Sequence, residues 1–310
     1  MLTIAGIGEA LFDVFPNGQR KLGGATLNFS VHAHQLLRNA GGRGMPVTRI
    51  GVDALGNEVV ANLDSFGIDT AGVQWDAARP TGQVVVSFSA DGQPDYDIVT
   101  GVAWDAIEFN DEARSLASKC DAVCFGTLAQ RDRRSASAIQ AFVEASPPKA
   151  LRLCDINLRQ SFFSEALIRR SLELANAAKL NSDELAVITG MLGIGVEEPA
   201  FEILARFELN YLILTRGERG TSIYTSAGVF EGERVSAVPA ADADPVGAGD
   251  ACAAACTVGL LLEHPPAAVA SFANRVGAFV ASQPGGTPRL PNSLLVRRDG
   301  ALPAGSVSGS

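Results

Sequence analysis

Short apolar runs alternate with longer segments of helical periodicity over most of the chain. Strands are predicted at six runs, residues 2–8, 47–51, 121–126, 150–156, 178–181 and 209–217. Helices are predicted between them, at residues 26–41, 56–67, 133–145, 164–177 and 182–189. Strands that alternate with helices form βαβ units, which build a mostly parallel sheet covered by helices on both faces. The pattern therefore predicts an α/β fold.

Two segments break this alternation. Residues 81–99 contain two strand-like runs around Asp91-Gly92, which is a strong signal for a hairpin turn. Residues 11–24 contain a Pro-Asn-Gly turn and no helical period. We interpret these segments as a small β lid, formed from about 11–24 and 73–104, on an α/β body of residues 1–290. Residues 291–310 are rich in Gly, Ser and Pro without periodicity and are interpreted as a C-terminal tail.

Composition narrows the class of protein. The chain has 310 residues and a net charge of −9, which argues against a nucleic-acid partner because such a partner requires a basic face. The acidic charge does not exclude an anionic ligand, since a nest of backbone N–H groups can hold a phosphate. No apolar run approaches the roughly 20 residues that span a bilayer, and the N-terminus lacks the features of a signal peptide. Five cysteines show no metal-like clustering with histidine, so we expect buried thiols in a cytoplasmic protein without a membrane partner.

The segment "AADADPVGAGDACAAAC", residues 240–256, places Gly247-Ala248-Gly249-Asp250 at the start of a predicted helix. The first turn of a helix has unpaired N–H groups and a partial positive charge, and glycine lets a ligand approach the backbone closely. Together these features predict an anion hole. Asp250 beside it could accept the proton of a hydroxyl that attacks a phosphoryl group. The spacing alone also suits an acid that only complements the helix dipole.

Two early motifs carry polar side chains next to predicted strands or helices. Gly23-Gly24 precedes a helix in which Asn28 lies one turn along, and an amide can bind vicinal hydroxyls as donor and acceptor. Glu9 and Asp13 follow the first strand, where an α/β sheet usually presents its ligand site. A loop-to-helix entry and a polar loop explain the same residues without a ligand.

Two later motifs have a similar double interpretation. Asn181 and Glu184 match a capping box, and they also match a pair that holds a phosphate-bound Mg²⁺ through waters. Thr215-Arg216 precedes Gly217 and Gly220, which suits either a tight turn or a loop that binds nucleotide phosphates.

The sequence has no P-loop, and "GIGEAL" lacks the third glycine of a dinucleotide fingerprint. Its three histidines form no zinc site or Ser-His-Asp arrangement.

The order of these motifs, with "DINLR" at 155–159 between them, resembles that of the ribokinase-like (PfkB) carbohydrate kinases. "GEALFDVFP", "GVAWDAI" and "DINLR" are most similar to the fructokinase branch. The resemblance spans roughly residues 2 to 290. It implies a three-layer α/β/α sandwich with a small β lid, often used for dimerisation. It also implies transfer of the γ-phosphoryl group of ATP, with Mg²⁺, to a primary sugar hydroxyl.

The resemblance assigns roles to matching positions. It makes Asp250 the catalytic base and places an arginine, Arg159, near the sugar or the transferring phosphate. The anion hole matches Gly247, Ala248 and Gly249. The sugar-binding positions match Asp13, Gly23, Gly24 and Asn28. Asn181 and Glu184 match the Mg²⁺–phosphate motif. The nucleotide loop matches Thr215, Arg216, Gly217 and Gly220, and Asn274 matches a position near the adenine. In the same resemblance, Gly247 and Gly249 also face the nucleotide.

Many members of this family bind a monovalent cation such as K⁺ beside the anion hole. The matching positions here are Asp244, Val246, Ala281 and Gly286. The family usually has Thr after the first Asp of the late motif, whereas this chain has Pro245. Proline has no N–H and fixes φ, and the threonine hydroxyl is lost, so this substitution bears directly on the cation site.

The acceptor is left open by the sequence, with fructose as the first candidate. A nucleoside would use aromatic stacking surface, and the lid offers Phe12, Phe15, Phe88 and Tyr96. A sugar acid such as 2-keto-3-deoxygluconate would use a cation, and Lys21 or Arg159 could serve. Ribose and a sugar or nucleotide sensor without catalysis are further alternatives.

Overall fold

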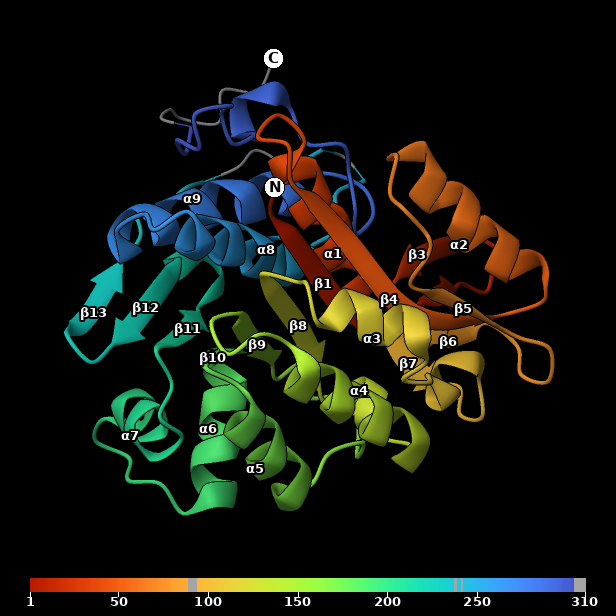
Figure 1. Cartoon of the computed structure of the whole chain (residues 1–310), viewed down its shortest axis with the longest axis horizontal. Helices are drawn as coiled ribbons and strands as arrows, with labels where there is room; N and C mark the ends of the chain where they lie inside the picture. Colours follow the sequence, from red (N-terminus) through yellow and green to blue (C-terminus); the bar gives the residue numbers. More distant parts are fainter. Residues whose placement is uncertain (89–93, 237–238, 241, 304–310) are drawn as a thin grey trace.

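The computed structural model of the chain describes residues 1–88, 94–236, 239–240 and 242–303. Its main feature is a large sheet between two layers of helices (Figure 1). The strand order is β13-β12-β11-β10-β9-β8-β1-β4-β5. The strands run over Thr3–Ile7 (β1), Arg43–Gly51 (β4), Val73–Asp76 (β5), Ala122–Gly126 (β8), Leu151–Asp155 (β9), Ala177–Asn181 (β10), Tyr211–Thr215 (β11), Thr221–Thr225 (β12) and Gly228–Glu231 (β13). Pairing is parallel from β5 to β11 and antiparallel at β12 and β13, as expected for a three-layer α/β/α fold.

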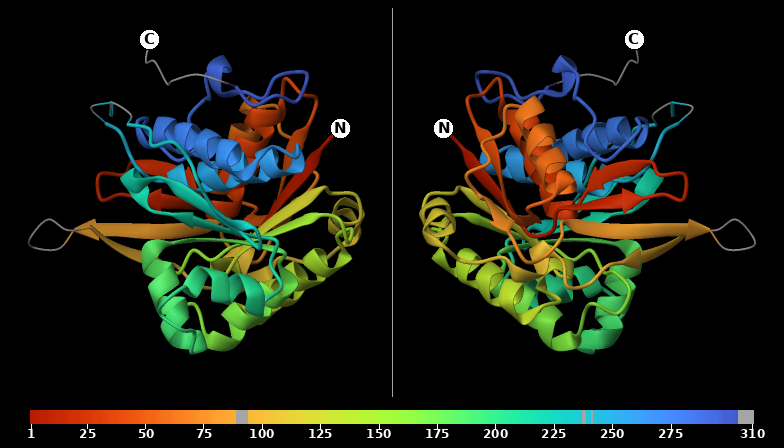
Figure 2. Two further views of the ribbon diagram at one scale, coloured as in Figure 1. Left: turned by 90° about the vertical axis from the view of Figure 1, so that its left-hand side faces the viewer. Right: turned by 90° about the vertical axis from the view of Figure 1, so that its right-hand side faces the viewer.

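The helices form one layer on each face of this sheet, as the side views show (Figure 2). One layer contains Ala25–Leu37 (α1), Ala248–Leu261 (α8) and Pro266–Ala281 (α9). The other contains Asp111–Ala117 (α3), Arg133–Ala145 (α4), Glu165–Leu174 (α5), Ser182–Leu192 (α6) and Pro199–Arg206 (α7). Alternate strand residues face opposite layers. Ile4 accordingly packs with the α1, α8 and α9 side chains, whereas Ile7 packs with those of the opposite layer.

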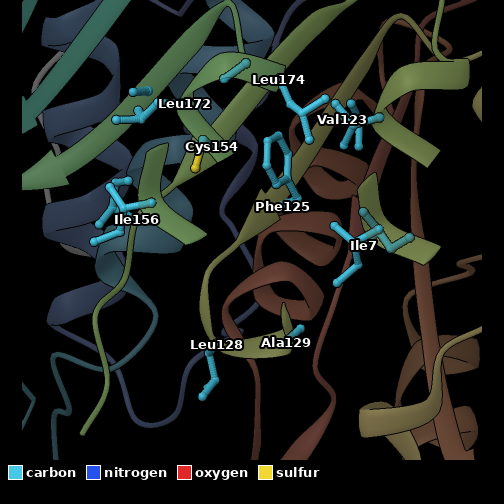
Figure 3. Close-up of a cluster of buried hydrophobic side chains, with 14 of the residues drawn as sticks. Ile7, Val123, Phe125, Leu128, Ala129, Cys154, Ile156, Leu172 and Leu174 are labelled. Atoms are coloured by element: carbon cyan, nitrogen blue, oxygen red, sulfur yellow. The ribbon is translucent and has the colours of Figure 1, made fainter. Parts of the chain in front are cut away.

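Buried aliphatic and aromatic side chains fill the space between the sheet and the α3–α7 layer. Figure 3 shows Ile7, Val123 and Phe125 from neighbouring strands beside Leu172 and Leu174 of α5. All three strand residues are 1% exposed or less. This packing holds the central strands in position. The candidate site residues come immediately after the ends of these strands in the chain.

A second sheet lies beside the body. It has the order β3-β2-β6-β7 and consists of Leu11–Val14 (β2), Arg20–Gly23 (β3), Gly82–Phe88 (β6) and Pro94–Ile98 (β7). The β6 and β7 strands pair antiparallel and project outward from the body (Figure 2). The predicted turn at Asp91-Gly92 lies outside the described residues.

Two segments assigned by sequence to the lid belong to the body instead. β5 pairs in parallel with β4 of the large sheet, and Trp104 is fully buried in the core of the α3–α7 layer. The described part of the lid sheet therefore consists of residues 11–23, 82–88 and 94–98. The strand-like pattern of β5 could not show which sheet it joins, because that depends on tertiary pairing.

The predicted elements mostly form near their expected positions, and α4 has the predicted bounds. The helix α1 ends at Leu37, four residues before the predicted glycine stop. Residues 294–296, which the sequence pattern assigned to the tail, pack in the core, and the Val296 N–H donates to the Leu36 carbonyl at 3.0 Å. The helices α3 and α7 and the strand β13 were not predicted. Among the described residues no helix has the length and apolarity needed to cross a membrane.

Candidate active site

The start of α8 is an uncapped helix end held by a tight turn. Ala248 donates its N–H to the Pro245 carbonyl at 3.3 Å, and Gly247 has φ 81° and ψ −11°. These angles match the third residue of a type II turn, a position that requires glycine. A Cβ on Gly247 would also lie 2.2 Å from the Gly286 carbonyl oxygen. No side chain caps the first turn of α8, so its amides can receive an anion.

Asp250 lies in this first turn and is held by α1. Its Oδ2 accepts a hydrogen bond from Asn28 Nδ2 at 2.8 Å. Burial of the carboxyl and the nearby charge of Asp155 raise the pKa of Asp250 to about 6, while Lys179 and the Asn28 bond oppose the shift. A carboxylate with this pKa is mostly ionised at neutral pH and is well matched to accepting a proton.

A buried ion pair lies under the same turn. Lys179 Nζ, on β10, donates to Asp155 Oδ1 at 2.8 Å and to Oδ2 at 2.9 Å, on β9. A Cβ on Gly249 would be 3.5 Å from Lys179 Nζ, so the glycine leaves the ammonium close to the backbone of α8. Burial alone would lower the pKa of Lys179, but Asp155 and Asp250 raise it, and the group stays charged. The sequence analysis missed Lys179; the only local signal is a charge inside an otherwise apolar strand.

Glu9 closes the opposite side of this region. It is 2% exposed, and its Oε1 accepts the N–H of Ala25 at 2.9 Å, which satisfies the first turn of α1. Burial raises the pKa of Glu9 to about 7, and Asp250 contributes to the rise while Arg159 opposes it. Gly24 caps α1 with φ 115°, and a Cβ there would be 2.3 Å from the Glu9 carbonyl oxygen. Glycine is thus required where the chain turns into α1.

The predicted sugar-binding residues converge here. Asp13 lies on β2 opposite Lys21 of β3, and burial raises the pKa of Asp13, as does Asp244. Gly23 lies next to it, since a Cβ there would be 3.9 Å from Asp13 Oδ2. Asp13 of the lid thus lies at the same end of the molecule as Gly24 and Asn28, which lie at the start of α1.

Arg159 follows β9 in an exposed loop with unusual backbone angles. It acts electrostatically on the carboxyls of Glu9, Asp13 and Asp250, in each case lowering the pKa. Its neighbours Asn157 and Gln160 have φ of 43° and 47°, in the left-handed region. Such strained conformations cluster at functional sites.

Asn181 and Glu184 form the predicted capping box at the start of α6. Asn181 Oδ1 accepts from the Glu184 N–H at 2.9 Å, and Glu184 Oε2 accepts from the Asn181 N–H at 2.8 Å. Glu184 Oε1 also accepts from the Leu158 N–H at 3.1 Å, which ties the Arg159 loop to α6. Each carboxylate oxygen keeps a further lone pair, so the pair fits a hydrated Mg²⁺ bound through waters rather than a directly coordinated ion.

The predicted nucleotide loop is only partly assembled. Thr215 ends β11 directly beside Asn181, its register partner on β10. Gly220 has φ 84° and contacts Asn274 of α9, because a Cβ would lie 2.9 Å from Asn274 Nδ2. Gly217 has φ 57° and begins a short 3₁₀ turn. Arg216, which follows β11, instead points across β12 to β13, where its Nη2 lies 2.9 Å from Glu231 Oε1.

Two of the four predicted monovalent-cation positions, Asp244 and Gly286, are already engaged within the chain. Asp244 Oδ1 accepts from the Val246 N–H at 3.0 Å, and Asp244 Oδ2 accepts from Lys21 Nζ at 2.6 Å. The Gly286 carbonyl lies 2.9 Å from His32 Nε2. Burial lowers the pKa of His32 to about 4, so the imidazole is neutral and its Nε2–H donates this bond. Ala281 is the last residue of α9.

A known protein family and several named relatives match nearly the whole chain. The family model for pfkB family carbohydrate kinases matches residues 13–293. The fructokinase of Klebsiella pneumoniae is 27% identical over 303 residues, covering 92% of this chain and 95% of the relative. Fructokinase-1 of Oryza sativa subsp. japonica is 28% identical over 313 residues, covering 95% and 92%.

Solved structures share the fold. The fructokinase of Xylella fastidiosa with bound ATP superposes with a TM-score of 0.79 at 21% identity, covering 92% of this chain and 93% of that one. A double mutant of the fructokinase of Vibrio cholerae O395, bound to fructose, ADP and potassium ion, has a TM-score of 0.74 at 23% identity and covers 94% and 96%.

Proposed function

The chain belongs to the pfkB family of carbohydrate kinases and is an ATP-dependent sugar kinase, and we propose that its acceptor is fructose, converted to fructose 6-phosphate. The observation that carries the proposal is the hydrogen bond between Asn28 and Asp250 beside the uncapped start of α8. It joins a group that can bind sugar hydroxyls to a carboxylate that can accept a hydroxyl proton. The relatives named fructokinase favour fructose among the sugars.

Phosphoryl transfer depends chiefly on positioning and on offsetting negative charge. We propose that Asp13, Gly24 and Asn28 hold the sugar so that its primary hydroxyl lies against Asp250. Asp250 takes the hydroxyl proton as the oxygen attacks the γ-phosphorus of ATP, and the bond from that phosphorus to the β,γ-bridging oxygen breaks to release ADP. The amides of Gly247 to Asp250, with the partial positive charge of the helix end, stabilise charge on the transferring group.

Two cations of the chain support the same step from different sides. Lys179 places a buried positive charge under Gly249, and its attraction for the Asp250 carboxylate lowers the pKa of that group. Arg159 lies in the exposed loop after β9 and acts on all three carboxyls of the region. We propose that Arg159 approaches the transferring phosphate, because it is the exposed member of the two.

The nucleotide is proposed to lie along the ends of β10 and β11. Asn181 and Glu184 would hold Mg²⁺ through waters, and Thr215 ends the adjacent strand. The bound Mg²⁺ supplies charge neutralisation of the ATP phosphates. Gly217, Gly220 and Asn274 would line the remainder of the nucleotide site. Arg216 is proposed to act there only if its pair with Glu231 opens.

The alternative acceptors differ in what the structure offers them. Phe12 is 1% exposed and packs in a core cluster, so it gives a nucleoside no stacking surface. Lys21 is bound to Asp244, which leaves Arg159 as the cation for a sugar acid. These contacts remove one candidate residue from each alternative, and the relatives named fructokinase favour a neutral sugar.

A screen of ADP release decides the acceptor. The protein is given ATP and Mg²⁺ with fructose, tagatose, ribose, 2-keto-3-deoxygluconate or a nucleoside, and kcat/KM is measured for each. The proposal predicts the highest value for fructose and phosphate on O6 of the product, located by NMR. A higher value for any other acceptor would reassign the substrate.

We also propose that two copies associate through the small sheet. The β6 and β7 strands project from the body (Figure 2). Val85 on β6 and Tyr96 on β7 are 46% and 48% exposed. Light scattering after size exclusion would give a dimer for the wild type. Val85→Asp would give a monomer, and a monomeric wild type would contradict this association.

A further inference from the structure

The loop before the anion hole carries an acidic charge that the chain itself neutralises. Both carboxylate oxygens of Asp244 are engaged, one by the Val246 N–H and the other by Lys21 Nζ. The Asp244 N–H in turn donates to the Gln283 carbonyl at 3.1 Å, and the Gly286 carbonyl is bound by His32. Asp244 and Gly286 are two of the four positions that the family resemblance gives to a monovalent cation. A separately bound K⁺ would therefore compete with Lys21, the Val246 N–H and His32 for the oxygens of these two residues.

Lys21 is well placed to supply the positive charge that a bound K⁺ would bring. Its Nζ lies 2.6 Å from Asp244 Oδ2 although the two residues are 223 positions apart, and their side chains are 28% and 17% exposed. The ammonium also lies 5.5 Å from the centre of the Phe15 ring, within range of a cation–π contact. Asp13 stands opposite on β2, and Lys21 lowers the pKa of this carboxyl as well. One lysine thus serves two carboxylates of the site.

We propose that the Lys21 ammonium is a built-in monovalent cation for the 244–250 loop, and that the kinase works without added K⁺. The proposal rests on the proposed function for its catalytic readout. An ammonium carries the same single charge as K⁺, and that of Lys21 donates a hydrogen bond to Asp244 Oδ2, an oxygen of one of the predicted cation positions. The position of Pro245 agrees with this, because the threonine typical of the family is absent.

Because Lys21 is part of the chain, the position of its charge depends on the position of the lid, unlike that of a free ion. Lys21 belongs to β3 of the lid, whereas Asp244 belongs to the loop that leads into α8. The charge therefore reaches the loop only when the lid strand is seated against the body. Lid position and the shape of the anion hole are coupled through this one pair.

The test compares the wild type with Lys21→Met, which keeps length and removes charge, and with Lys21→Arg, which keeps charge. Lys149→Met, an exposed lysine in the turn before β9, is the matched control. Each protein is measured in potassium chloride and in choline chloride at equal ionic strength. The readouts are kcat with the best acceptor and the thermal unfolding midpoint.

The wild type and Lys149→Met are expected to show the same kcat and the same midpoint in both salts. Lys21→Met is expected to lose kcat by about tenfold in choline, the effect of roughly one lost charge contact, and to regain part of it in potassium. Lys21→Arg is expected to resemble the wild type. A wild type that needs K⁺ would overturn the proposal. So would a Lys21→Met protein equal to the wild type, or one whose loss is shared by Lys21→Arg and is insensitive to K⁺.

The unfolding midpoint separates this proposal from the proposed function. If no acceptor is phosphorylated, the function fails, but the midpoint still reports the cation. A wild-type midpoint that rises when potassium replaces choline overturns the built-in cation. A midpoint that rises with potassium only in Lys21→Met supports it.

Discussion

Asn28 and Asp250 are 222 positions apart in the chain, yet a hydrogen bond of 2.8 Å joins their side chains. Each lies in the first turn of its helix, Asn28 in α1 and Asp250 in α8, and both helices cover the same face of the large sheet. The carboxylate therefore has a fixed direction before any substrate binds. Preorganisation of this kind lowers the cost of orienting a proton acceptor.

Replacing Asp250 with Asn should remove the proton acceptor and keep the shape of the side chain. We expect kcat to fall by roughly 10²–10⁴-fold, the usual contribution of a general base. Binding of fructose, measured by calorimetry, should stay within a few-fold of the wild type, because the sugar contacts remain. Turnover like that of the wild type would contradict the assignment of Asp250 as the base.

The pH dependence of kcat should report the ionisation of Asp250. The reaction needs the ionised carboxylate, so the rate should fall as the pH drops through about 6. The Asn28 hydrogen bond lowers the pKa of Asp250, and Asn28→Ala should therefore move this acid limb to higher pH by about one unit. A kinetic profile from pH 5 to 8 would measure it. If Asn28→Ala changes only KM and the acid limb of the profile stays at the same pH, the Asn28 hydrogen bond does not control the pKa of Asp250.

Glu9 should make the folded state less stable at high pH. Its pKa rises from an ordinary 4.5 to about 7 on folding, so the folded protein binds the proton more tightly than the unfolded chain. Stability is then lost as the pH rises between these two values, by about 3 kcal/mol in all. Glu9→Gln keeps an acceptor for the Ala25 N–H and cannot ionise.

The Glu9→Gln protein should consequently have a higher unfolding midpoint than the wild type at pH 8, with little difference near pH 4.5. Denaturant or thermal unfolding at both pH values would measure the effect. Glu173→Gln, an exposed glutamate on α5, provides the comparison and should show no such pH-dependent gain. An equal response of the two variants would mean that Glu9 is not protonated in the folded protein.

Gly247→Ala should damage the site far more than an alanine at another left-handed glycine. The backbone angle alone costs about 1–2 kcal/mol for a residue with a Cβ. At Gly247 the new Cβ would also meet the Gly286 carbonyl at 2.2 Å, whereas at Gly193, with φ 62°, nothing lies within 4 Å.

Gly193→Ala should thus lose stability and keep its kcat, and Gly247→Ala should lose both. Unfolding curves and ADP release, measured on the two variants in parallel, would establish the difference. Retention of full activity by Gly247→Ala would show that the turn before α8 does not shape the catalytic centre.

The sequence predicted those features of the fold and site that depend on local chemistry. The start of α8 at Gly247 and the capping box of Asn181 and Glu184 were both predicted, because each is visible in a short window of the sequence. The alternation of strands and helices gave the α/β class for a similar reason. The roles assigned to these residues in catalysis stay predictions.

Features that depend on distant partners could not be predicted in this way. Lys179 is paired with Asp155 on the neighbouring strand, and Lys21 is paired with Asp244 near the other end of the chain. Arg216 was predicted for the nucleotide loop, but its ion pair is with Glu231, on a strand that the sequence analysis did not identify. In each case the charge is evident in the sequence and its partner is set by tertiary pairing.

The carboxylate at 250 and the amide at 28 come from opposite ends of the polypeptide, and β1 lies between β4 and β8 in the middle of the sheet. A ribosome that has produced the first two hundred residues has made Asn28 without the residue that holds it. The reactive centre can close only after the segment from 244 to 286 has emerged. Chains cut short during synthesis would therefore carry no uncontrolled phosphotransferase activity, even if their early strands had already folded.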